Sequence, residues 1–252
     1  LRRKVGDNSD VTSAYNDGWY DRGTKMGSTR RTSLVVDPPD GRIPPLTPEG
    51  KARAERAIPQ SGIQRFTIVG SWLDRGIWER CITRGVPDVM LPTAYNNNYR
   101  IFQTKDTVAI LAEMIHDARI IPLESKPHLP SGIRQWMGDS RGHWEGDTLV
   151  VETTGFNGRR GWFGTPMTEG GGGTRLDAKM KVTERFTRTA ANILLYQFTV
   201  DDPGMFTKPW SGEIPMQAVQ GPIYEYACHE GNYGMPNILS GARAAEREGK
   251  KP

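Results

Sequence analysis

Two histidines stand beside carboxylates in this sequence, His116 next to Asp117 and His229 next to Glu230. Imidazole titrates near neutral pH, and a desolvated histidine beside a carboxylate suits general acid/base catalysis. Each pair follows a pattern that predicts a strand, and strand ends that meet would form a polar mouth on an apolar barrel, where barrels commonly hold ligands. We therefore expect His116 or His229 to shuttle a proton, with Asp117 and Glu230 orienting the rings.

Two further carboxylates occupy strand positions with apolar neighbours. Glu113 lies in the run 108–116, and Glu184 lies on the inward face of the run 181–187. Desolvation among apolar side chains raises the pKa of a carboxyl group, so Glu113 or Glu184 is the expected second acid or base. Cations and aromatic rings are the expected substrate contacts, with Arg119 as the anion stabiliser: Arg119, Arg134, Arg141, Tyr20, Arg22, Trp144 and Tyr226.

Each of these residues also has a structural interpretation. A histidine on an apolar face is often a hydrogen-bonded core residue, and an inward glutamate often pairs with a structural arginine. The number of inward polar groups favours a functional role, because each one costs free energy to bury: Glu113, His116, Glu184, Glu225 and His229.

A metal site built from His116, His229 and a carboxylate is a legitimate ligand set. No HxH, HExxH or paired-cysteine spacing supports it, so neither a metal nor another cofactor is expected. A serine hydrolase is disfavoured as well, because the sequence has no GxSxG motif around Ser140 or elsewhere.

Period-2 alternation predicts the strands that would position these groups. The central hairpin is expected from the runs 99–103 and 108–116, joined by the polar turn 104–107. A second hairpin turn is expected at 142–148, where Gly and Asp accumulate before an apolar run. The other expected strands are 31–36, 149–154, 181–187, 193–200 and 223–230.

Capping signals predict short helices. Thr47 is the expected N-cap of a helix that continues to residue 57, with Pro48 in its first turn. Ser71 and Asp74 resemble a capping box for a helix over 72–83, and Pro236 opens a helix to about residue 248. Pro209 and Pro215 predict an irregular passage between the last two expected strands.

The composition predicts many turns, because 29 Gly and 18 Pro are scattered without a period. We expect a mainly β fold, a single antiparallel β-barrel or strongly curved sheet of lipocalin-like character, with two or three short peripheral helices. A β-sandwich is the alternative. The expected domain covers residues 31–252, follows an extended arm over 1–30, and contains a Gly-rich loop at 155–178 that is a lid or a flexible insertion.

Charge and hydropathy exclude two classes of partner. The 33 basic and 29 acidic residues are mixed along the chain, and no basic stripe or aromatic-basic motif marks a nucleic-acid binder. No apolar run approaches the roughly 20 residues that span a bilayer. The first ten residues are polar and contain no signal peptide, as in a mature product whose leader has been removed.

Cys81 and Cys228 are open to two interpretations, free buried thiols or one disulfide in an oxidising compartment. The runs SLVVDPPDGRIPPLTPEG, EMIHDARIIPL, WMGDSRGHWEGDTLVVETT and YEYACHEGNYGM resemble uncharacterised exported proteins of environmental bacteria. The resemblance covers most of the chain from about Trp19 onward. It implies a periplasmic or extracellular location and favours a Cys81–Cys228 bridge, but it supplies no activity and no catalytic residues.

The leading hypothesis is an exported enzyme that acts on a small organic substrate by metal-free acid/base chemistry, as a lyase, isomerase or hydrolase. The alternatives are a non-catalytic binding protein for an apolar ligand or a glycan, and a structural subunit of an extracellular assembly. An enzyme should present two ionisable groups to one cavity, whereas a binding barrel should have its histidines hydrogen-bonded to the backbone. A homo-oligomer is left open.

Overall fold

The computed structural model describes residues 30–55, 70–93, 95–124, 126–158 and 178–249 of the chain. Its strands are β1 Val35–Asp37, β2 Tyr99–Gln103, β3 Thr107–Ala112, β4 Ala118–Pro122, β5 Asp139–Glu145, β6 Thr148–Thr154, β7 Lys181–Ala190, β8 Ile193–Asp201 and β9 Trp210–Gln217. Its helices are α2 Pro48–Glu55 and α3 Gly234–Arg247, with short 3₁₀ turns at η2 Trp72–Asp74, η3 Asp88–Met90 and η4 Met114–His116.

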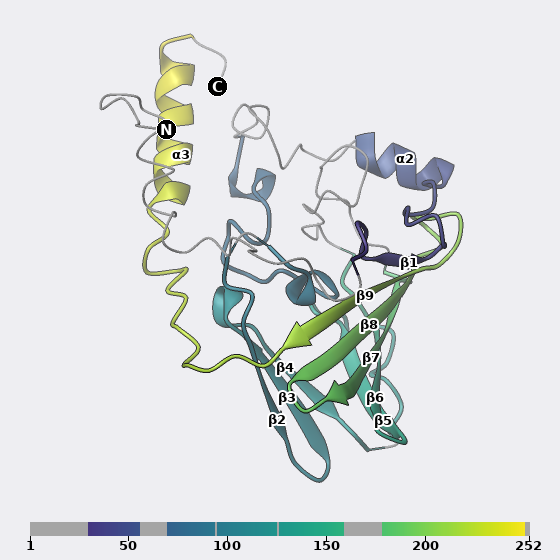
Figure 1. Ribbon diagram of the computed structural model, residues 1–252. Helices are drawn as coiled ribbons and strands as arrows, with labels where there is room; N and C mark the ends of the chain where they lie inside the picture. The colour runs from purple at the N-terminus through teal and green to yellow at the C-terminus, as the bar shows by residue number, and fades with distance from the viewer. Residues whose placement is uncertain (1–29, 56–69, 94, 125, 159–177, 250–252) are drawn as a thin grey trace.

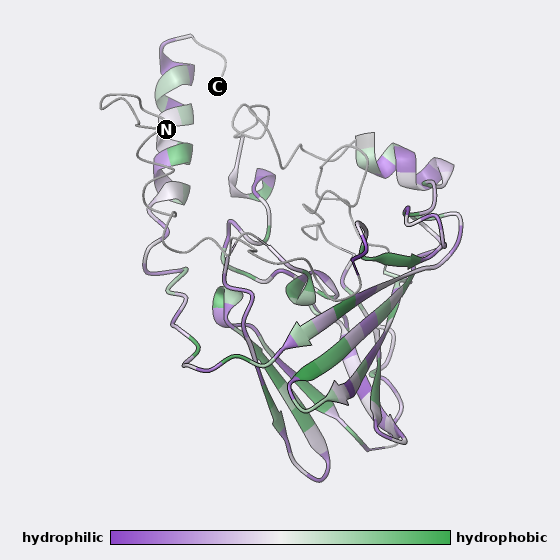
Figure 2. Ribbon diagram, in the orientation of Figure 1, coloured by the Kyte–Doolittle hydropathy of each residue, from purple (hydrophilic) through white to green (hydrophobic). Residues whose placement is uncertain are grey.

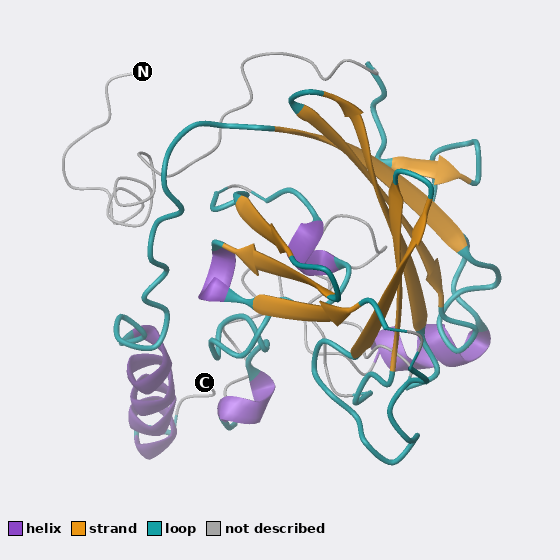
Figure 3. Ribbon diagram, turned by 90° about the horizontal axis from the view of Figure 1, so that it is seen from below, coloured by secondary structure: helices purple, strands orange, loops and turns teal. Residues whose placement is uncertain are grey.

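The described strands form two antiparallel sheets, which confirms the mainly β prediction. The larger sheet has the order β1-β9-β8-β7-β6-β5, and the smaller has the order β2-β3-β4. Seen from below, the smaller sheet lies in front of one face of the larger one (Figure 3). Both helices lie outside the sheets, as expected (Figure 1).

Alternating burial explains why the larger sheet forms as it does. Along β7 the side chains of Val182, Glu184 and Phe186 are buried, while the residues between them are partly exposed. The inner face continues on β8 with Tyr196 and Phe198. In the register of the sheet, Tyr196 is paired with Phe186 and Phe198 is paired with Glu184. Figure 2 shows the resulting hydrophobic bands along the strands. These inner faces form the core between the two sheets.

The two sheets approach each other closely along β4 and β5. A Cβ atom built at Gly142 on β5 would lie 2.9 Å from Cγ2 of Ile121 on β4 and 2.9 Å from Cδ2 of Leu123. Such distances are shorter than real Cβ contacts, so any larger residue would have to displace the Ile121 and Leu123 side chains.

We expect Gly142→Ala to lower the free energy of unfolding by about 1 to 3 kcal/mol, because the added methyl overpacks the contact between the sheets. Gly132→Ala is the matched control, since a Cβ at that position meets nothing within 4 Å. Urea titration of both variants measures the effect. Equal midpoints for the two variants would show that β4 and β5 do not depend on this contact.

The opposite edges of the two sheets are not hydrogen-bonded to each other. In the described ranges β2 pairs only with β3, and β9 pairs with β8 and, over a short stretch, with β1. The N–H of Glu213 points to the β1 side, where it donates to the Leu34 carbonyl at 2.9 Å. Peptide groups two residues apart point the same way, so Pro215 presents no N–H on this edge. The two sheets therefore face each other at β2 and β9 without backbone hydrogen bonds between these strands, and we call this gap in the hydrogen bonding the seam.

The central hairpin is confirmed, but its second strand ends earlier than expected. β3 stops at Ala112, and Ile115 and His116 adopt φ of 60° and 48°. A left-handed backbone cannot continue a strand. The chain turns there and returns as β4, which adds a third strand to the sheet and places Arg119 on it.

The expected helix over 72–83 is wrong beyond its first turn. The capping box of Ser71 and Asp74 is present, but it caps only η2. Cys81 adopts φ 55°, which ends any right-handed helix, and the buried Ile77 and Arg84 lie among irregular turns.

The expected strand over 223–230 is also wrong. These residues form no strand, and the position beside β8 belongs to β9, in the passage that the prolines had marked as irregular. Beyond its short pairing with β1 at Ser211 and Gly212, β9 is an edge strand of the described sheet. An edge strand tolerates proline where the missing N–H faces away from its partner, which is the situation of Pro215. After β9 the chain leaves the sheet and runs around the outside to α3 (Figures 1 and 3).

The remaining expected elements begin or end at other residues than predicted. The turn expected at 142–148 is only Gly146 and Asp147, because β5 continues to Glu145. Of the expected strand 31–36, only Val35 and Val36 belong to β1, which ends at Asp37. Thr47 is confirmed as an N-cap and accepts a hydrogen bond from the Gly50 N–H at 2.9 Å. The arm and most of the Gly-rich loop lie outside the described residues, as does the expected end of the first helix at residue 57.

Candidate functional site

A disulfide joins Cys81 to Cys228, as the resemblance favoured, and bridges a sequence separation of 147 residues. Around it the Asn232 side chain donates to the Glu79 carbonyl at 2.9 Å. The bridge therefore fastens the segment that precedes α3 to the turns that follow η2.

A buried ion pair connects the two sheets. Arg119 on β4 binds Glu184 on β7 with both terminal nitrogens, at 2.9 Å and 2.6 Å, and Tyr196 donates to the same carboxylate at 2.9 Å. Ser140 and Thr153 accept from the guanidinium at 3.2 Å and 3.5 Å. Glu184 and Tyr196 are 0 % exposed.

The electrostatics of this group favour a fixed ion pair. Burial lowers the pKa of Arg119, but the charge and hydrogen bonds of Glu184 outweigh burial, so the pKa is raised. Burial also raises the pKa of the Tyr196 phenol far above its usual value, with the Glu184 charge as the second cause. Arg119 therefore stays charged and Tyr196 stays a donor, an arrangement that suits a structural tie better than proton transfer.

The other predicted carboxylates hold the corner between β3 and β4. Glu113 is buried and accepts from the side-chain amides of Asn96 at 2.6 Å and Asn98 at 2.9 Å. Asp117 accepts from the Thr83 hydroxyl at 2.7 Å, and burial raises its pKa while this hydrogen bond opposes the shift.

The structure does not join the two predicted histidines. His116 is exposed, and its Nδ1 lies 3.0 Å from the backbone carbonyl of Tyr226. His229 and Glu230 are exposed on the segment before α3. Among the described residues, no hydrogen bond or ion pair links the histidines to each other or to Glu113 or Glu184.

The expected substrate contacts are dispersed. Tyr226 lines a pocket of about 530 Å³ near the disulfide, together with Trp78 and Tyr95. Trp144 is 45 % exposed on β5. Arg134 donates to the carbonyls of Phe156 and Ala178, Arg141 pairs with Asp139, and Tyr20 and Arg22 lie outside the described residues.

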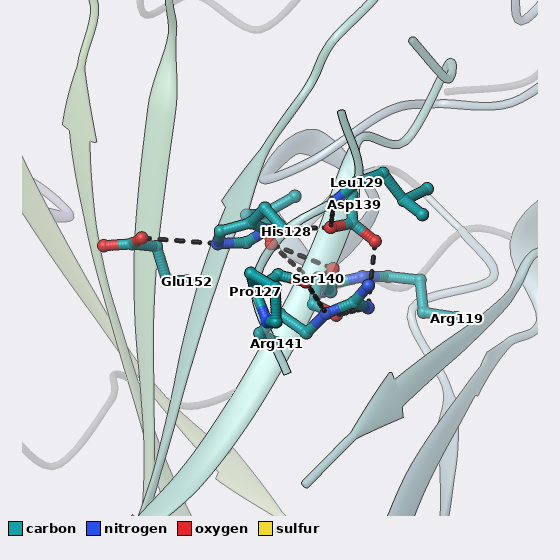
Figure 4. Close-up of polar contacts among 9 residues, drawn as sticks. Arg119, Pro127, His128, Leu129, Asp139, Ser140, Arg141 and Glu152 are labelled. Carbon is teal, nitrogen blue, oxygen red and sulfur yellow. Dashed lines mark hydrogen bonds and ion pairs between the residues drawn. The ribbon is translucent and has the colours of Figure 1, made fainter. Parts of the chain in front are cut away.

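A polar cluster that the sequence did not indicate surrounds Asp139 at the start of β5 (Figure 4). Asp139 accepts from His128 Nδ1 at 2.8 Å, from the Leu129 N–H at 3.0 Å, and from Arg141 at 2.9 Å. The other ring nitrogen of His128 lies 3.3 Å from Glu152. The cluster docks the connection between β4 and β5 onto the outer strands, and none of its residues lines either pocket described here.

The larger of the two pockets formed by described residues lies between the two sheets, along the seam. This inter-sheet pocket has a volume of about 700 Å³ and is lined by β2, by the turn between β7 and β8, and by β8 and β9. Its apolar lining comes from both sheets and from Met90 of η3. The sheet residues are Tyr99, Ile101, Leu194, Ile214 and Met216.

Tyr99 adds a fixed polar group to this lining. Its hydroxyl donates to the Val89 carbonyl at 2.9 Å. Burial raises the pKa of Tyr99 to about 12, opposed by the charge of Arg84. The phenol is therefore neutral near pH 7, and its ring presents an apolar wall.

None of the six predicted acid/base residues lines this pocket or the smaller one. Within the described ranges no group of three or more His, Cys, Asp and Glu side chains has an arrangement that could hold a metal. None of the described helices is long and apolar enough to cross a membrane.

No family model, curated protein or solved structure matches this chain. The site must therefore be interpreted from its own geometry.

Sequence reasoning missed the inter-sheet pocket because it missed β9. Ile214 and Met216 lie on the inner face of that strand and form one wall. The period-2 alternation that predicts a strand is present in this stretch, at Trp210, Gly212, Ile214 and Met216. Pro215 led to the prediction of an irregular passage instead.

Proposed function

We propose that the protein is a non-catalytic binding protein that holds an apolar small molecule in the inter-sheet pocket. The observation that carries the proposal is an apolar cavity of about 700 Å³ between the inner faces of two sheets. Its volume is in the range of ligand sites, which are typically apolar with a few placed polar groups.

We further infer that the two sheets act as the walls of one lipocalin-like barrel that is open along the seam. The contact of Gly142 with Ile121 supports closure on the β4–β5 side. The buried pair of Arg119 and Glu184 holds the walls at a fixed separation. A container of this kind can admit a ligand between β2 and β9 without breaking a strand ladder.

The binding role is favoured over the acid/base enzyme by the partners of the ionisable groups. His116 contacts a backbone carbonyl, and Glu113 and Glu184 are occupied by amides and by Arg119. The enzyme hypothesis remains a prediction for which no described cavity supplies two ionisable groups of the expected set. An exported location is supported by the disulfide, because disulfides persist in oxidising compartments.

An apolar ligand is favoured over a glycan by the lining. Glycan sites present aromatic faces and dense hydrogen-bonding groups, whereas this pocket has one aromatic ring, that of Tyr99, and eleven of its eighteen lining residues are aliphatic, Met or Pro. The six lining residues with polar side chains are a minority: Asn97, Asn98, Arg100, Arg188, Asn192 and Gln217.

Leu194→Trp should abolish or weaken ligand binding, because the larger ring fills the pocket from the inner face of β8. The neutral dye Nile red, titrated by fluorescence, is the probe, and we expect its affinity to fall about tenfold or more.

Leu195→Trp is the matched control. Leu195 precedes Tyr196 on the same strand, points to the opposite face, and does not line the pocket. A proposal of binding between the sheets fails if wild-type protein does not bind Nile red, or if both variants bind it as wild type does. Thermal unfolding of both variants verifies that they are folded.

A further inference from the structure

The charge around the inter-sheet pocket has one sign. Arg100 and Arg188 line it, and no aspartate or glutamate is among the described lining residues. Elsewhere in the described chain, arginines commonly pair with carboxylates, as Arg31 does with Glu213 and Arg185 with Glu145. The pocket therefore combines an apolar interior with uncompensated positive charge.

The register of the larger sheet places Arg188 at the rim of the apolar wall. Arg188 is paired with Leu194, and Leu194 is paired with Met216 on β9. Alternation along β7 puts Arg188 on the same face as Glu184 and Phe186, which are buried. Arg188 itself is exposed, so it is where the inner face of β7 reaches solvent.

The Arg188 guanidinium is held in place but keeps donors for a ligand. One terminal nitrogen donates to the Ala191 carbonyl at 2.6 Å, which anchors the side chain over the β7–β8 turn. Arg188 forms no ion pair with a described residue. A guanidinium carries five N–H donors, so one carbonyl leaves most of them unused.

Arg100 supplies the second charge from the opposite wall. It lies between Tyr99 and Ile101 on β2, the edge strand of the smaller sheet. Its side chain is exposed and forms no hydrogen bond or ion pair with another described residue. Because side chains alternate along β2, the Arg100 side chain leaves the strand on its outer face. We therefore assign Arg100 a weaker role in binding than Arg188.

We propose that the ligand is an anionic amphiphile, whose carboxylate, sulfate or phosphate group binds Arg188 and Arg100 while its apolar body lies between the sheets. This inference rests on the proposed function and names the class of molecule for the same pocket. Charge-assisted hydrogen bonds from arginine suit such acid groups, and a guanidinium is well matched to their geometry. A cationic ligand would meet like charge with no carboxylate to offset it.

The test compares two fluorescent probes with the same apolar body and different head groups, dansylaminoundecanoic acid with its carboxylate and the neutral methyl ester of that acid. Wild-type protein should bind the acid about ten- to a hundredfold more tightly than the ester, as expected for hydrogen bonds to a charged group. Arg188→Ala should remove most of this difference, because it weakens binding of the acid much more than binding of the ester. Arg188→Lys should restore part of it.

Arg185→Ala is the matched control, because it removes the same charge from the same strand on the opposite face. It should leave the affinity for both probes unchanged. A competition arm separates an amphiphile from a free anion: sodium acetate should displace the acid probe no better than sodium chloride at equal ionic strength.

The outcomes distinguish the two proposals. If the ester binds wild-type protein as tightly as the acid, or if Arg188→Ala and Arg185→Ala weaken the acid equally, the anionic class is wrong while Nile red binding stands. Displacement by acetate alone would point to a free-anion site and also overturn it. If neither probe nor Nile red responds to Leu194→Trp, the proposed function itself fails.

Discussion

Arg119→Met is expected to lower the free energy of unfolding by about 3 to 5 kcal/mol, because it leaves the Glu184 carboxylate buried without its cation. Glu184 is 0 % exposed, and without Arg119 its side chain keeps one hydrogen-bond donor among the described residues, the Tyr196 hydroxyl. The carboxylate cannot reach water without separating β4 from β7. Equilibrium denaturation in urea measures the loss, and the midpoint should fall with little change in slope.

Two further variants make this result specific. Arg119→Met with Glu184→Gln removes both charges but keeps an acceptor for Tyr196, so it should be more stable than Arg119→Met alone. Arg185→Met breaks the solvent-exposed pair with Glu145 and should leave the urea midpoint almost unchanged. If Arg119→Met and Arg185→Met cost the same, the tie between the sheets contributes no more than a surface pair.

Replacing Cys81 and Cys228 by alanine should cost about 5 kcal/mol in the chain-entropy model, given a sequence separation of 147 residues. The segment from residue 218 to α3 has no strand pairing within the described ranges, so it depends on this bond more than the sheets do. We expect faster amide hydrogen exchange in α3 and loss of the contact between His116 and the Tyr226 carbonyl.

The sheets provide the internal reference for this experiment. Amides of β6, β7 and β8 should keep their protection relative to global unfolding, while those of α3 lose protection selectively. Reduced wild-type protein should behave like the double variant. Unchanged exchange in α3 after reduction would mean that other contacts hold the C-terminal segment.

Local alternation was sufficient to predict the strands that carry their own pattern. The hairpin of β2 and β3, the strand β6 and the hairpin of β7 and β8 all lie close to where the sequence predicted them. Glu184 was correctly placed on an inward face for the same reason, since strand side chains alternate strictly. The structural interpretation of an inward glutamate, a pairing with arginine, matches the contact that it makes with Arg119.

Non-local constraints explain the errors. The run 223–230 alternates like a strand, but Cys228 is bonded to Cys81, which lies among the turns that follow η2. The run 72–83 begins with a correct capping box, but the disulfide partner Cys81 adopts a left-handed conformation there. Neither restraint can be seen in a window of neighbouring residues.

The candidate site was less predictable than the fold, because a pocket depends on which strands face each other. The sequence predicted a site at His116 and His229 because histidine can transfer protons. The pocket is lined instead by residues such as Leu194 and Met216, whose types do not by themselves indicate a site. Arg188 becomes informative only when the register places it at the end of a buried row.

The missing N–H of Pro215 has a consequence for how copies of this protein meet. Unpaired strand edges are templates for association with other chains, and proline is one of the devices that prevent it. Here it interrupts the donor pattern of β9 along the seam, where an extended peptide could otherwise pair with this strand. The side chains along the seam can therefore stay accessible to a ligand without promoting aggregation through β9. This arrangement favours a ligand that is not a peptide.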